Sequence, residues 1–494
     1  MGIIIKQSIK STVYAYIGAV IGLVNFGILM PKLMSTEEIG LIRYILSIVL
    51  LLSQFSGLGL SNITNRLFPY FRNKEKNHNG FFTLGLIISG MGTLLSIILY
   101  FSLESTFSMG ENQEIVFSDY VFYILPLSII TILWNYFDNF FRVLFNATIG
   151  VFLKELVARI LFSVGIVLFY LELIDFDIFV FSYFLAYSLP TFILAILLLI
   201  KKEFVIQVPR PYLIKKLNYQ ILNIGAFGML TGFSSIAILQ FDSVMLKLWT
   251  DLSVVGVYTT MYFFAVMILL PSRSIKKIAT IVVSESWKNN DKENILSIYF
   301  KSTITQLIIG AYLFLGIWTN IDNIIAVLGP EYEIGRYVVL LIGLTNVIDM
   351  FSGVNQAIIS TSKKYKYASV FMIVMLALIV LTNWIFIPIY GITGAAIASL
   401  IAMFVTTLLR YLFVWKTFNL QPYNYKHLIV IAISFFTYFI SYNLPVIANE
   451  YFDIILKGTV ITILFSFMIY FSKVSEDIND KAEGLFKLLF KTKK

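Results

Sequence analysis

The sequence lacks cysteine, contains only two histidines, and has few charged residues for its length. None of the 494 residues is Cys, and His78 and His427 lie in or beside polar connections. Disulfides and cysteine-ligated metals are therefore excluded within this chain, and a histidine-based metal site or catalytic dyad is not expected. Charged residues make up 13% of the chain, against roughly one quarter in soluble domains.

Hydrophobic residues instead dominate the composition. They make up 59% of the chain, and the mean hydropathy is +0.85, which indicates an integral membrane protein. A net charge of +9 would suggest nucleic-acid binding in a soluble protein. Here membrane orientation accounts for the basic residues, because cytoplasmic connections are enriched in Lys and Arg. No nucleic-acid partner is expected.

The apolar runs predict an all-α bundle that crosses the membrane many times. With about 20 apolar residues for each crossing, the chain accommodates about fourteen helices. Basic connections, such as that with Lys201 and Lys202, alternate with acidic ones, such as that with Glu172 and Asp175. This alternation predicts an even number of crossings with both termini in the cytoplasm.

A link from Lys201 to Leu217, which contains Pro209 and Pro211, divides the predicted helices into two groups of six. A weak internal repeat crosses this link, since Asn25, Lys32 and Gly40 correspond to Gln240, Lys247 and Gly256 at offsets of 215, 215 and 216. We therefore expect two similar lobes around a central cavity, followed by a helix pair. The predicted boundaries are residues 1–217, 218–426 and 427–494.

The stretch Asn383–Ser399 predicts a very short hairpin between two hydrophobic helices. Pro388 lacks an amide donor and is expected to end the first helix, and the second is expected to begin beyond Gly391. Small residues then recur at helical spacing, and such a face lets helices approach closely within a membrane. We expect close packing along this face, which comprises Gly391, Ala395, Ala398 and Ala402.

A polar stripe is predicted near the middle of the tenth helix. Asn346, Asp349, Gly353 and Gln356 fall at helical spacing on one face. Polar residues at membrane depth usually face protein or a water-filled cavity. Asn346, Asp349 and Gln356 are thus candidates for cation or proton coupling, or for hydroxyl recognition. The alternative is a hydrogen-bonded packing site.

Several basic residues near helix ends are candidates for binding an anionic substrate. Arg43 lies about one turn inside the second predicted helix, and Lys32 and Lys247 lie near external helix ends, with Asp242 close to Lys247. Arginine binds phosphate bidentately and lysine acts as a point charge, so a pyrophosphate ligand is the natural expectation. Snorkelling to the lipid headgroups is the alternative, as is simple pairing of Asp242 with a lysine.

Further basic residues have simpler explanations. Arg66 and Arg273, at inner helix ends, are placed to meet an anionic headgroup from the cytoplasm, but they also satisfy the orientation rule. Asp138 with Arg142, and Glu155 with Arg159, are spaced i to i+4, so we expect each couple to pair with itself.

With this topology assembled, the chain resembles the polysaccharide-repeat flippases of the multidrug/oligosaccharidyl-lipid/polysaccharide exporter superfamily, which serve O-antigen, capsule and teichuronic-type polymers. The resemblance covers essentially the full length. It is carried by the run Asn383–Ala398, by Phe241-Asp242 followed by Val255-Gly256-Val257-Tyr258, by Gly57-Leu58-Gly59-Leu60 with Arg66, and by Leu328-Gly329-Pro330-Glu331-Tyr332.

The resemblance implies a secondary transporter of the bacterial cytoplasmic membrane that flips an undecaprenyl-pyrophosphate-linked oligosaccharide by alternating access. It implies no cofactor beyond an ion gradient, H⁺ or Na⁺, or the membrane potential. Membrane lipids, a glycan polymerase and glycosyltransferases are the further partners. Arg43 fits the cationic cavity of the family, whereas the first helix carries Asn25 where an internal arginine is expected.

Other functions stay open at this point. A drug/cation antiporter of the same superfamily would favour an acidic cavity. A membrane glycan polymerase, ligase or acyltransferase usually needs a large external loop or an intramembrane histidine, and neither is evident in the sequence. The sequence also lacks a phosphate loop, His-Glu-x-x-His and Gly-x-Ser-x-Gly, so no enzymatic activity is expected. A non-transporting scaffold for glycan assembly is the remaining alternative.

Overall fold

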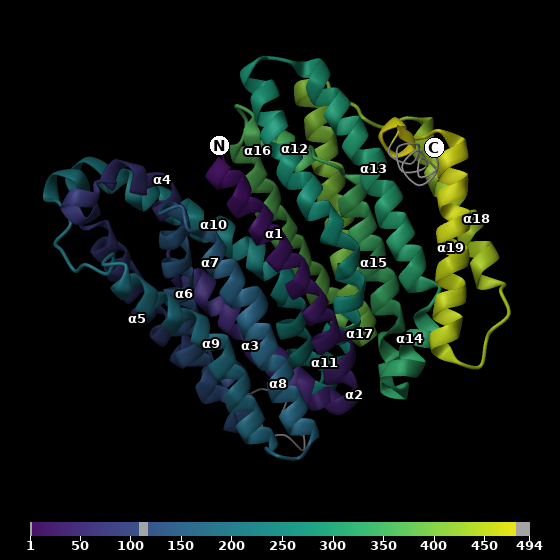
Figure 1. Ribbon diagram of the computed structural model, residues 1–494, viewed down its shortest axis with the longest axis horizontal. Helices are drawn as coiled ribbons and strands as arrows, with labels where there is room; N and C mark the ends of the chain where they lie inside the picture. The colour runs from purple at the N-terminus through teal and green to yellow at the C-terminus, as the bar shows by residue number, and fades with distance from the viewer. Residues whose placement is uncertain (1, 108–116, 481–494) are drawn as a thin grey trace, which may run out of the picture. The chain divides into compact units, whose positions relative to one another are not determined.

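Every regular element in the described part of the chain is a helix. The computed structural model describes residues 2–107 and 117–480, and no strand occurs among them. Twelve of the described helices are long and apolar enough to cross a membrane. The prediction of an all-α, multi-pass membrane protein is confirmed. The helices form two compact units, Met1–Thr259 and Thr260–Lys494 (Figure 1).

The first unit is built from long apolar helices joined by short helical turns. Its elements are α1 (Gly2–Gly22), the π-helical turn η1 (Leu23–Leu29), α2 (Met30–Leu33), α3 (Thr36–Ser56), α4 (Leu60–Phe71), η2 (Lys74–Gly80), α5 (Phe81–Phe107), η3 (Phe117–Asp119), η4 (Val121–Tyr123), α6 (Ile124–Val143), α7 (Ala147–Phe152), the π-helical turn η5 (Leu153–Val157), α8 (Ala158–Tyr170), α9 (Phe176–Ile200), α10 (Pro211–Trp249) and the start of α11 (Leu252–Val266).

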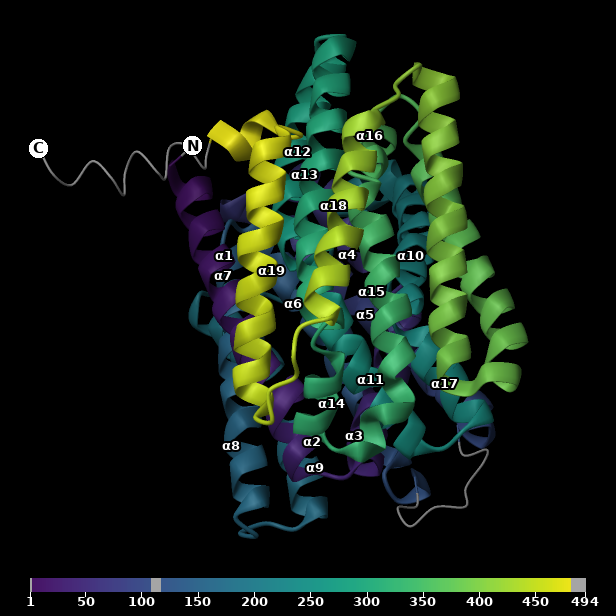
Figure 2. The same cartoon turned by 90° about the vertical axis from the view of Figure 1, so that its right-hand side faces the viewer.

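The second unit begins within α11. It continues with η6 (Met267–Leu269), α12 (Leu270–Lys288), α13 (Lys292–Trp318), α14 (Ile321–Leu328), η7 (Pro330–Gly335), α15 (Arg336–Phe351), α16 (Asn355–Thr361), α17 (Lys366–Phe418), α18 (Tyr425–Tyr442) and α19 (Glu450–Ser472). The terminal pair α18 and α19 lies side by side and packs on α13 (Figure 2).

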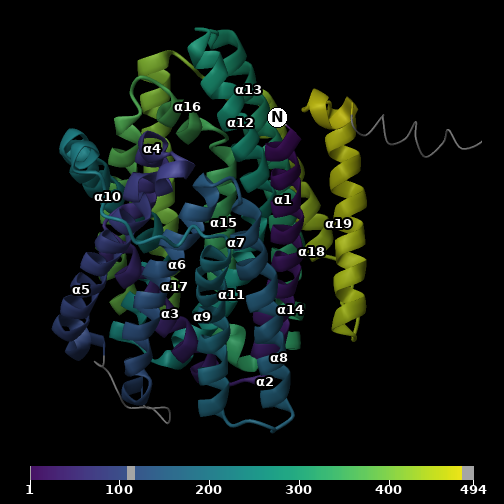
Figure 3. The same cartoon turned by 60° about the vertical axis from the view of Figure 1, so that its left-hand side comes forward.

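The predicted count of fourteen crossings stays a prediction. One of the twelve membrane-length helices is α17, whose 53 residues contain both arms of the predicted hairpin. The segment from α7 to α8 is absent from the twelve, and it carries Lys154, Glu155 and Arg159. The expected lobes 1–217 and 218–426 and the pair 427–494 are likewise untested by the two compact units. α10 belongs to the first unit because it packs along α3 and α4 (Figure 3).

The hairpin in α17 turns at Gly391 rather than at Pro388. Pro388 lies inside the helix, and the one non-helical residue is Gly391, with φ 55° and ψ −129°. The expectation that Pro388 ends the first arm is therefore wrong, since membrane helices tolerate proline where neighbouring groups satisfy the freed backbone. The small-residue face is confirmed for Ala395, Ala398 and Ala402, which are fully buried. Gly391 is not part of it, because it forms the turn and nothing lies within 4 Å of an added Cβ.

An aromatic cluster forms the core of the first unit. Phe68 of α4 lies with its ring centroid 5.3 Å from that of Phe81 and 5.7 Å from that of Phe140, both edge to face. This is the geometry that aromatic pairs prefer. Trp134 of α6 belongs to the same cluster, so the core supports one wall of the cavity described below.

The N-terminal ends of α3 and α11 cross at two glycines. A Cβ atom on Gly40 would lie 1.8 Å from the carbonyl oxygen of Leu252, and one on Gly256 would lie 1.8 Å from that of Thr36. The hydroxyls of Thr36 and Ser253 are 2.6 Å apart and hydrogen-bond across the crossing. The two backbones are therefore in direct contact, with no space for a side chain at either glycine.

The Gly40→Ala variant tests this contact. Because the added methyl group overlaps a backbone oxygen, we expect a loss of stability of about 1–3 kcal/mol, as for other overpacked sites. The thermal unfolding midpoint of the purified protein in detergent measures this loss.

Gly90→Ala is the matched control, because Gly90 also lies in a helix of the first unit and nothing lies within 4 Å of the added Cβ. Alanine in an open helical position should leave the midpoint unchanged or slightly raised. Equal midpoints for Gly40→Ala and the wild type would rule out the close crossing.

Candidate functional site

The first unit contains a cavity of about 180 Å³ lined by basic and aromatic side chains. We call it the cationic cavity. Its wall is formed by η1, α3, α6, η5, α8 and α9, so it gathers residues distant in sequence. The charged residues of the lining are Arg43, Lys154, Glu155 and Arg159, and the aromatic ones are Phe26, Trp134, Phe162, Tyr183 and Tyr187.

Arg43 lies near the N-terminal end of α3. Ser35 fixes that end through a capping box, in which Glu38 N donates to the Ser35 hydroxyl over 3.2 Å and Ser35 N donates to the Glu38 carboxylate over 2.7 Å. The Arg43 guanidinium carbon is 4.1 Å from the centroid of the Phe26 ring, a cation–π distance. Its Nε is buried and has no hydrogen-bond partner. Arg43 therefore retains a donor for an anionic ligand.

The second group of charges comes from η5 and α8. Arg159 pairs with Glu155 at 2.6 Å, as the i to i+4 spacing predicts, and it also donates to the carbonyl oxygen of Gly18. Lys154 lies 5.7 Å from the centroid of the Trp134 ring. With three basic groups and one carboxylate, the cavity is net positive at neutral pH.

Asn25 lies in η1 and is fully buried. Its Nδ2 donates to the carbonyl oxygen of Arg159 over 3.0 Å, and its Oδ1 accepts from the Ser163 hydroxyl at 2.8 Å. Both ends of the amide are thus used in holding η1 against α8. In this structure Asn25 positions the backbone of Arg159, and it does not line the cationic cavity.

The other predicted substrate residues of the first unit lie outside the lining of the cationic cavity. Asp242 is buried in α10 and accepts a hydrogen bond from the Tyr258 hydroxyl at 2.6 Å. Lys247, on the same helix, is also buried. Lys32 of α2 and Arg66 of α4 are exposed. A part for these four in substrate binding stays a prediction.

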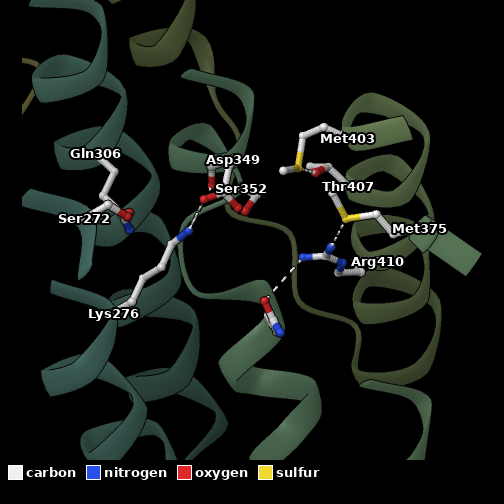
Figure 4. A network of polar contacts seen from close by, with 10 residues as sticks. Ser272, Lys276, Gln306, Asp349, Ser352, Met375, Met403, Thr407 and Arg410 are labelled. Atoms are coloured by element: carbon white, nitrogen blue, oxygen red, sulfur yellow. Dashed lines mark hydrogen bonds and ion pairs between the residues drawn. The ribbon is translucent and has the colours of Figure 1, made fainter. Parts of the chain in front are cut away.

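In the second unit, Asp349 forms an ion pair with Lys276 of α12. Lys276 Nζ lies 2.7 Å from Asp349 Oδ2 and 3.3 Å from the Asp349 carbonyl oxygen (Figure 4). The side chains are 30% and 20% exposed, so the pair is only partly accessible. Arg273, one turn earlier on α12, is exposed.

The predicted polar face from Asn346 to Gln356 is wrong, because the helix breaks within it. α15 ends at Phe351, Gly353 has φ +60°, and α16 begins at Asn355. Asn346 is buried and donates to the Ala265 carbonyl oxygen at 2.8 Å, which is a packing contact. Gln356 is exposed and its Oε1 lies 3.5 Å from the buried Arg410. Ion coupling by Asp349, Asn346 and Gln356 stays a prediction.

Sequence reasoning did not assign Lys154, Arg159, Lys276 or Arg410 to a site. Each lies within or beside an apolar run, and charge at membrane depth was the signal that could have identified them. Orientation and i to i+4 pairing offered a simpler explanation, so Arg43 was the one basic residue of the cationic cavity that the sequence singled out. The Lys276–Asp349 pair joins helices 73 residues apart in sequence, which no local spacing predicts.

Sequence comparison identifies one family. A family model described as "Polysaccharide biosynthesis protein" matches residues 4–275, which is more than half of the chain. No curated protein matches the sequence.

Solved structures share the fold. A structure titled "Lipid II flippase MurJ, inward closed conformation" is 17% identical, with a TM-score of 0.75 over 94% of this chain and 99% of its own. An inward-facing multidrug resistance MATE family transporter is 16% identical, with a TM-score of 0.63 over 81% of this chain and 95% of its own. A MOP superfamily transporter from Pyrococcus furiosus is 17% identical, with a TM-score of 0.56 over 83% and 95%. At these identities, the likeness is one of fold.

The Lys276–Asp349 pair is testable by a double-mutant cycle with Lys276→Met and Asp349→Asn. Either single variant leaves one partly buried charge without its partner, so the double variant should be less destabilised than the sum of the two. We expect a coupling energy of about 1 kcal/mol or more, between the values of surface and buried pairs. The cycle is measured from the unfolding midpoints, in detergent, of the wild type, the two single variants and the double variant.

The Arg336–Asp322 pair is the control, because its aspartate is 63% exposed. Its coupling should stay within about 0.2–1 kcal/mol. A Lys276–Asp349 coupling no larger than that of the control would contradict the predicted contribution.

Proposed function

The chain belongs to the polysaccharide biosynthesis protein family, and we propose that it flips an undecaprenyl-pyrophosphate-linked oligosaccharide from the cytoplasmic to the outer leaflet. Transport proceeds by alternating access. The protein acts in the bacterial cytoplasmic membrane with both termini in the cytoplasm, and it carries out no covalent chemistry. A glycan polymerase and glycosyltransferases are its proposed functional partners.

The cationic cavity is the observation that supports this proposal. A diphosphate carries concentrated negative charge, and arginine matches it with paired donors. Arg43 has an unused buried donor, and Lys154 and Arg159 add positive charge in the same cavity. Holding these cations at membrane depth is costly, and an anionic ligand compensates for that cost.

A cationic cavity disfavours the drug/cation antiporter. The charge that would attract a diphosphate repels a cationic drug. Asp349, the carboxylate that sequence reasoning favours for cation binding, is paired with Lys276 at 2.7 Å. The MATE structures share the fold alone, so we do not propose this activity.

The energy source is proposed to be an ion gradient, H⁺ or Na⁺, or the membrane potential. Among the polar residues predicted for coupling, Asp349 is the one with an ionisable side chain. Asp349 of α15 pairs with Lys276 of α12, so a coupling ion that binds at Asp349 would act on the contact between these two helices.

The Arg43→Ala variant tests the diphosphate site. Loss of a charge-assisted contact in a buried cavity should weaken binding of an undecaprenyl-diphosphate-linked disaccharide by about 10–100-fold. Arg43→Lys should restore part of the affinity, because it keeps the charge but not the paired donors. Binding is measured on purified protein in nanodiscs, and translocation in proteoliposomes.

Arg210→Ala is the control, since Arg210 is an exposed arginine of the same unit at the start of α10. It should bind as the wild type does. Wild-type affinity and translocation in Arg43→Ala would reject the proposed site, and a wild-type protein that neither binds nor moves the lipid would reject the function.

The Asp349→Asn variant tests coupling. If the carboxylate carries the coupling proton or sodium ion, translocation should lose its dependence on an imposed pH or sodium gradient. Asp322→Asn, which removes a surface carboxylate, should retain that dependence. Gradient dependence that persists in Asp349→Asn would make Asp349 a structural residue.

A further inference from the structure

A second cavity lies in the second unit at the break between α15 and α16. Its volume is about 210 Å³, and most of its lining is polar. We call it the amide cavity, after Asn355 and Gln356 in its wall. The other polar residues of the lining are Lys276, Thr280, Asp349, Ser352 and Ser360.

Asn355 is the unexplained member of this lining. It is fully buried, yet neither its amide nitrogen nor its amide oxygen has a hydrogen-bond partner. A buried polar group without a partner is destabilising, and the large majority of such groups in folded proteins are paired. Asn355 combines two unused donor hydrogens with an unused acceptor in the wall of a cavity. A ligand that both accepts and donates would satisfy it.

The charges of the amide cavity cancel. Lys276 and Asp349 neutralise one another at 2.7 Å, and the Ser352 hydroxyl donates to the Asp349 carbonyl oxygen at 2.7 Å. The Ser360 hydroxyl is turned back to the Ala357 carbonyl oxygen at 3.2 Å. The unused hydrogen-bonding capacity is therefore that of an uncharged amide. The cationic cavity, by contrast, holds an excess of positive charge.

We propose that the amide cavity binds a sugar group of the glycan through Asn355. The inference rests on the proposed function and adds a site for the saccharide, separate from the site for the diphosphate. Sugar hydroxyl and acetamido groups both donate and accept, which matches an amide. The cavity is small beside ordinary ligand sites of about 300–1,000 Å³, so it takes one part of the glycan. Gln356, next in sequence, adds a second amide to the same wall.

The test compares two ligands on the same purified protein in nanodiscs. One is undecaprenyl diphosphate, and the other is undecaprenyl diphosphate carrying an N-acetylglucosamine disaccharide, which presents hydroxyl and acetamido groups. The wild type should bind the glycosylated lipid more tightly. Asn355→Leu, of similar shape but without hydrogen bonds, should reduce this preference by about three- to tenfold, the effect of one lost hydrogen bond.

Stability separates ligand binding from a structural role. Because leucine removes an unpaired buried amide, Asn355→Leu should unfold at the same temperature as the wild type or higher. A fall in the midpoint together with an unchanged ligand preference would make Asn355 structural and overturn the proposal. Ser360→Ala is the matched control in the same lining. This variant should prefer the glycosylated lipid as strongly as the wild type does, because the Ser360 hydroxyl donates within its own helix.

The outcomes also separate this inference from the proposed function. Arg43→Ala should weaken both ligands alike and leave the preference intact, whereas Asn355→Leu should weaken only the glycosylated one. A wild type that binds both ligands equally overturns the sugar site and leaves the flippase proposal standing. A wild type that binds neither ligand overturns both. If Asn355→Leu fails to fold, Asn355→Ala, which adds no bulk, gives the same comparison.

Discussion

The interior of a membrane contains no water, so each helix break and each charge within a span must be satisfied by the protein itself. The features of this chain follow from that constraint. Arg43 lies against the Phe26 ring, and Lys276 pairs with Asp349. The amide of Asn25 bonds to the backbone beside Arg159 and to Ser163. Arg43 Nε and the Asn355 amide are among the buried groups without a partner, and both residues line cavities.

The same constraint gives small residues a central part in packing. Apolar side chains gain little by leaving lipid, so helices associate through close backbone approach. The crossing of α3 and α11 illustrates this, because Gly40 faces the Leu252 carbonyl and Gly256 faces the Thr36 carbonyl. Thr36 and Leu252, like Gly40 and Gly256, are separated by 216 residues. Gly40 and Gly256, one matched pair of the weak repeat, thus make equivalent contacts on the two sides of this crossing.

Composition and periodicity were enough to predict the all-α membrane fold, the buried alanine face of α17 and the Glu155–Arg159 pair, since each depends on local spacing. They also singled out Arg43, which lines the cationic cavity, and its part in binding an anion stays a prediction. They failed at Pro388, whose effect depends on neighbouring helices, and they did not predict the Lys276–Asp349 pair, whose members are 73 residues apart in sequence. The break at Gly353 was missed because a glycine in an apolar helix fits a straight helix as well as a left-handed turn.

The two cavities differ in charge and in hydrogen-bonding capacity. The cationic cavity has a net positive charge, whereas the amide cavity has an uncharged amide without partners. A diphosphate is common to all lipid carriers of this class, so a cationic cavity attracts every such lipid and distinguishes none of them by its glycan. Discrimination between glycans needs groups that form hydrogen bonds with one sugar and not with another, so that the two ligands differ in affinity. Asn355 is such a group, and it is already unpaired in the free protein. In the proposed function, a ligand without a matching sugar would leave the Asn355 amide unpaired, whereas a ligand with one would gain its hydrogen bond. This difference would let a transporter with a shared charge site select its glycan.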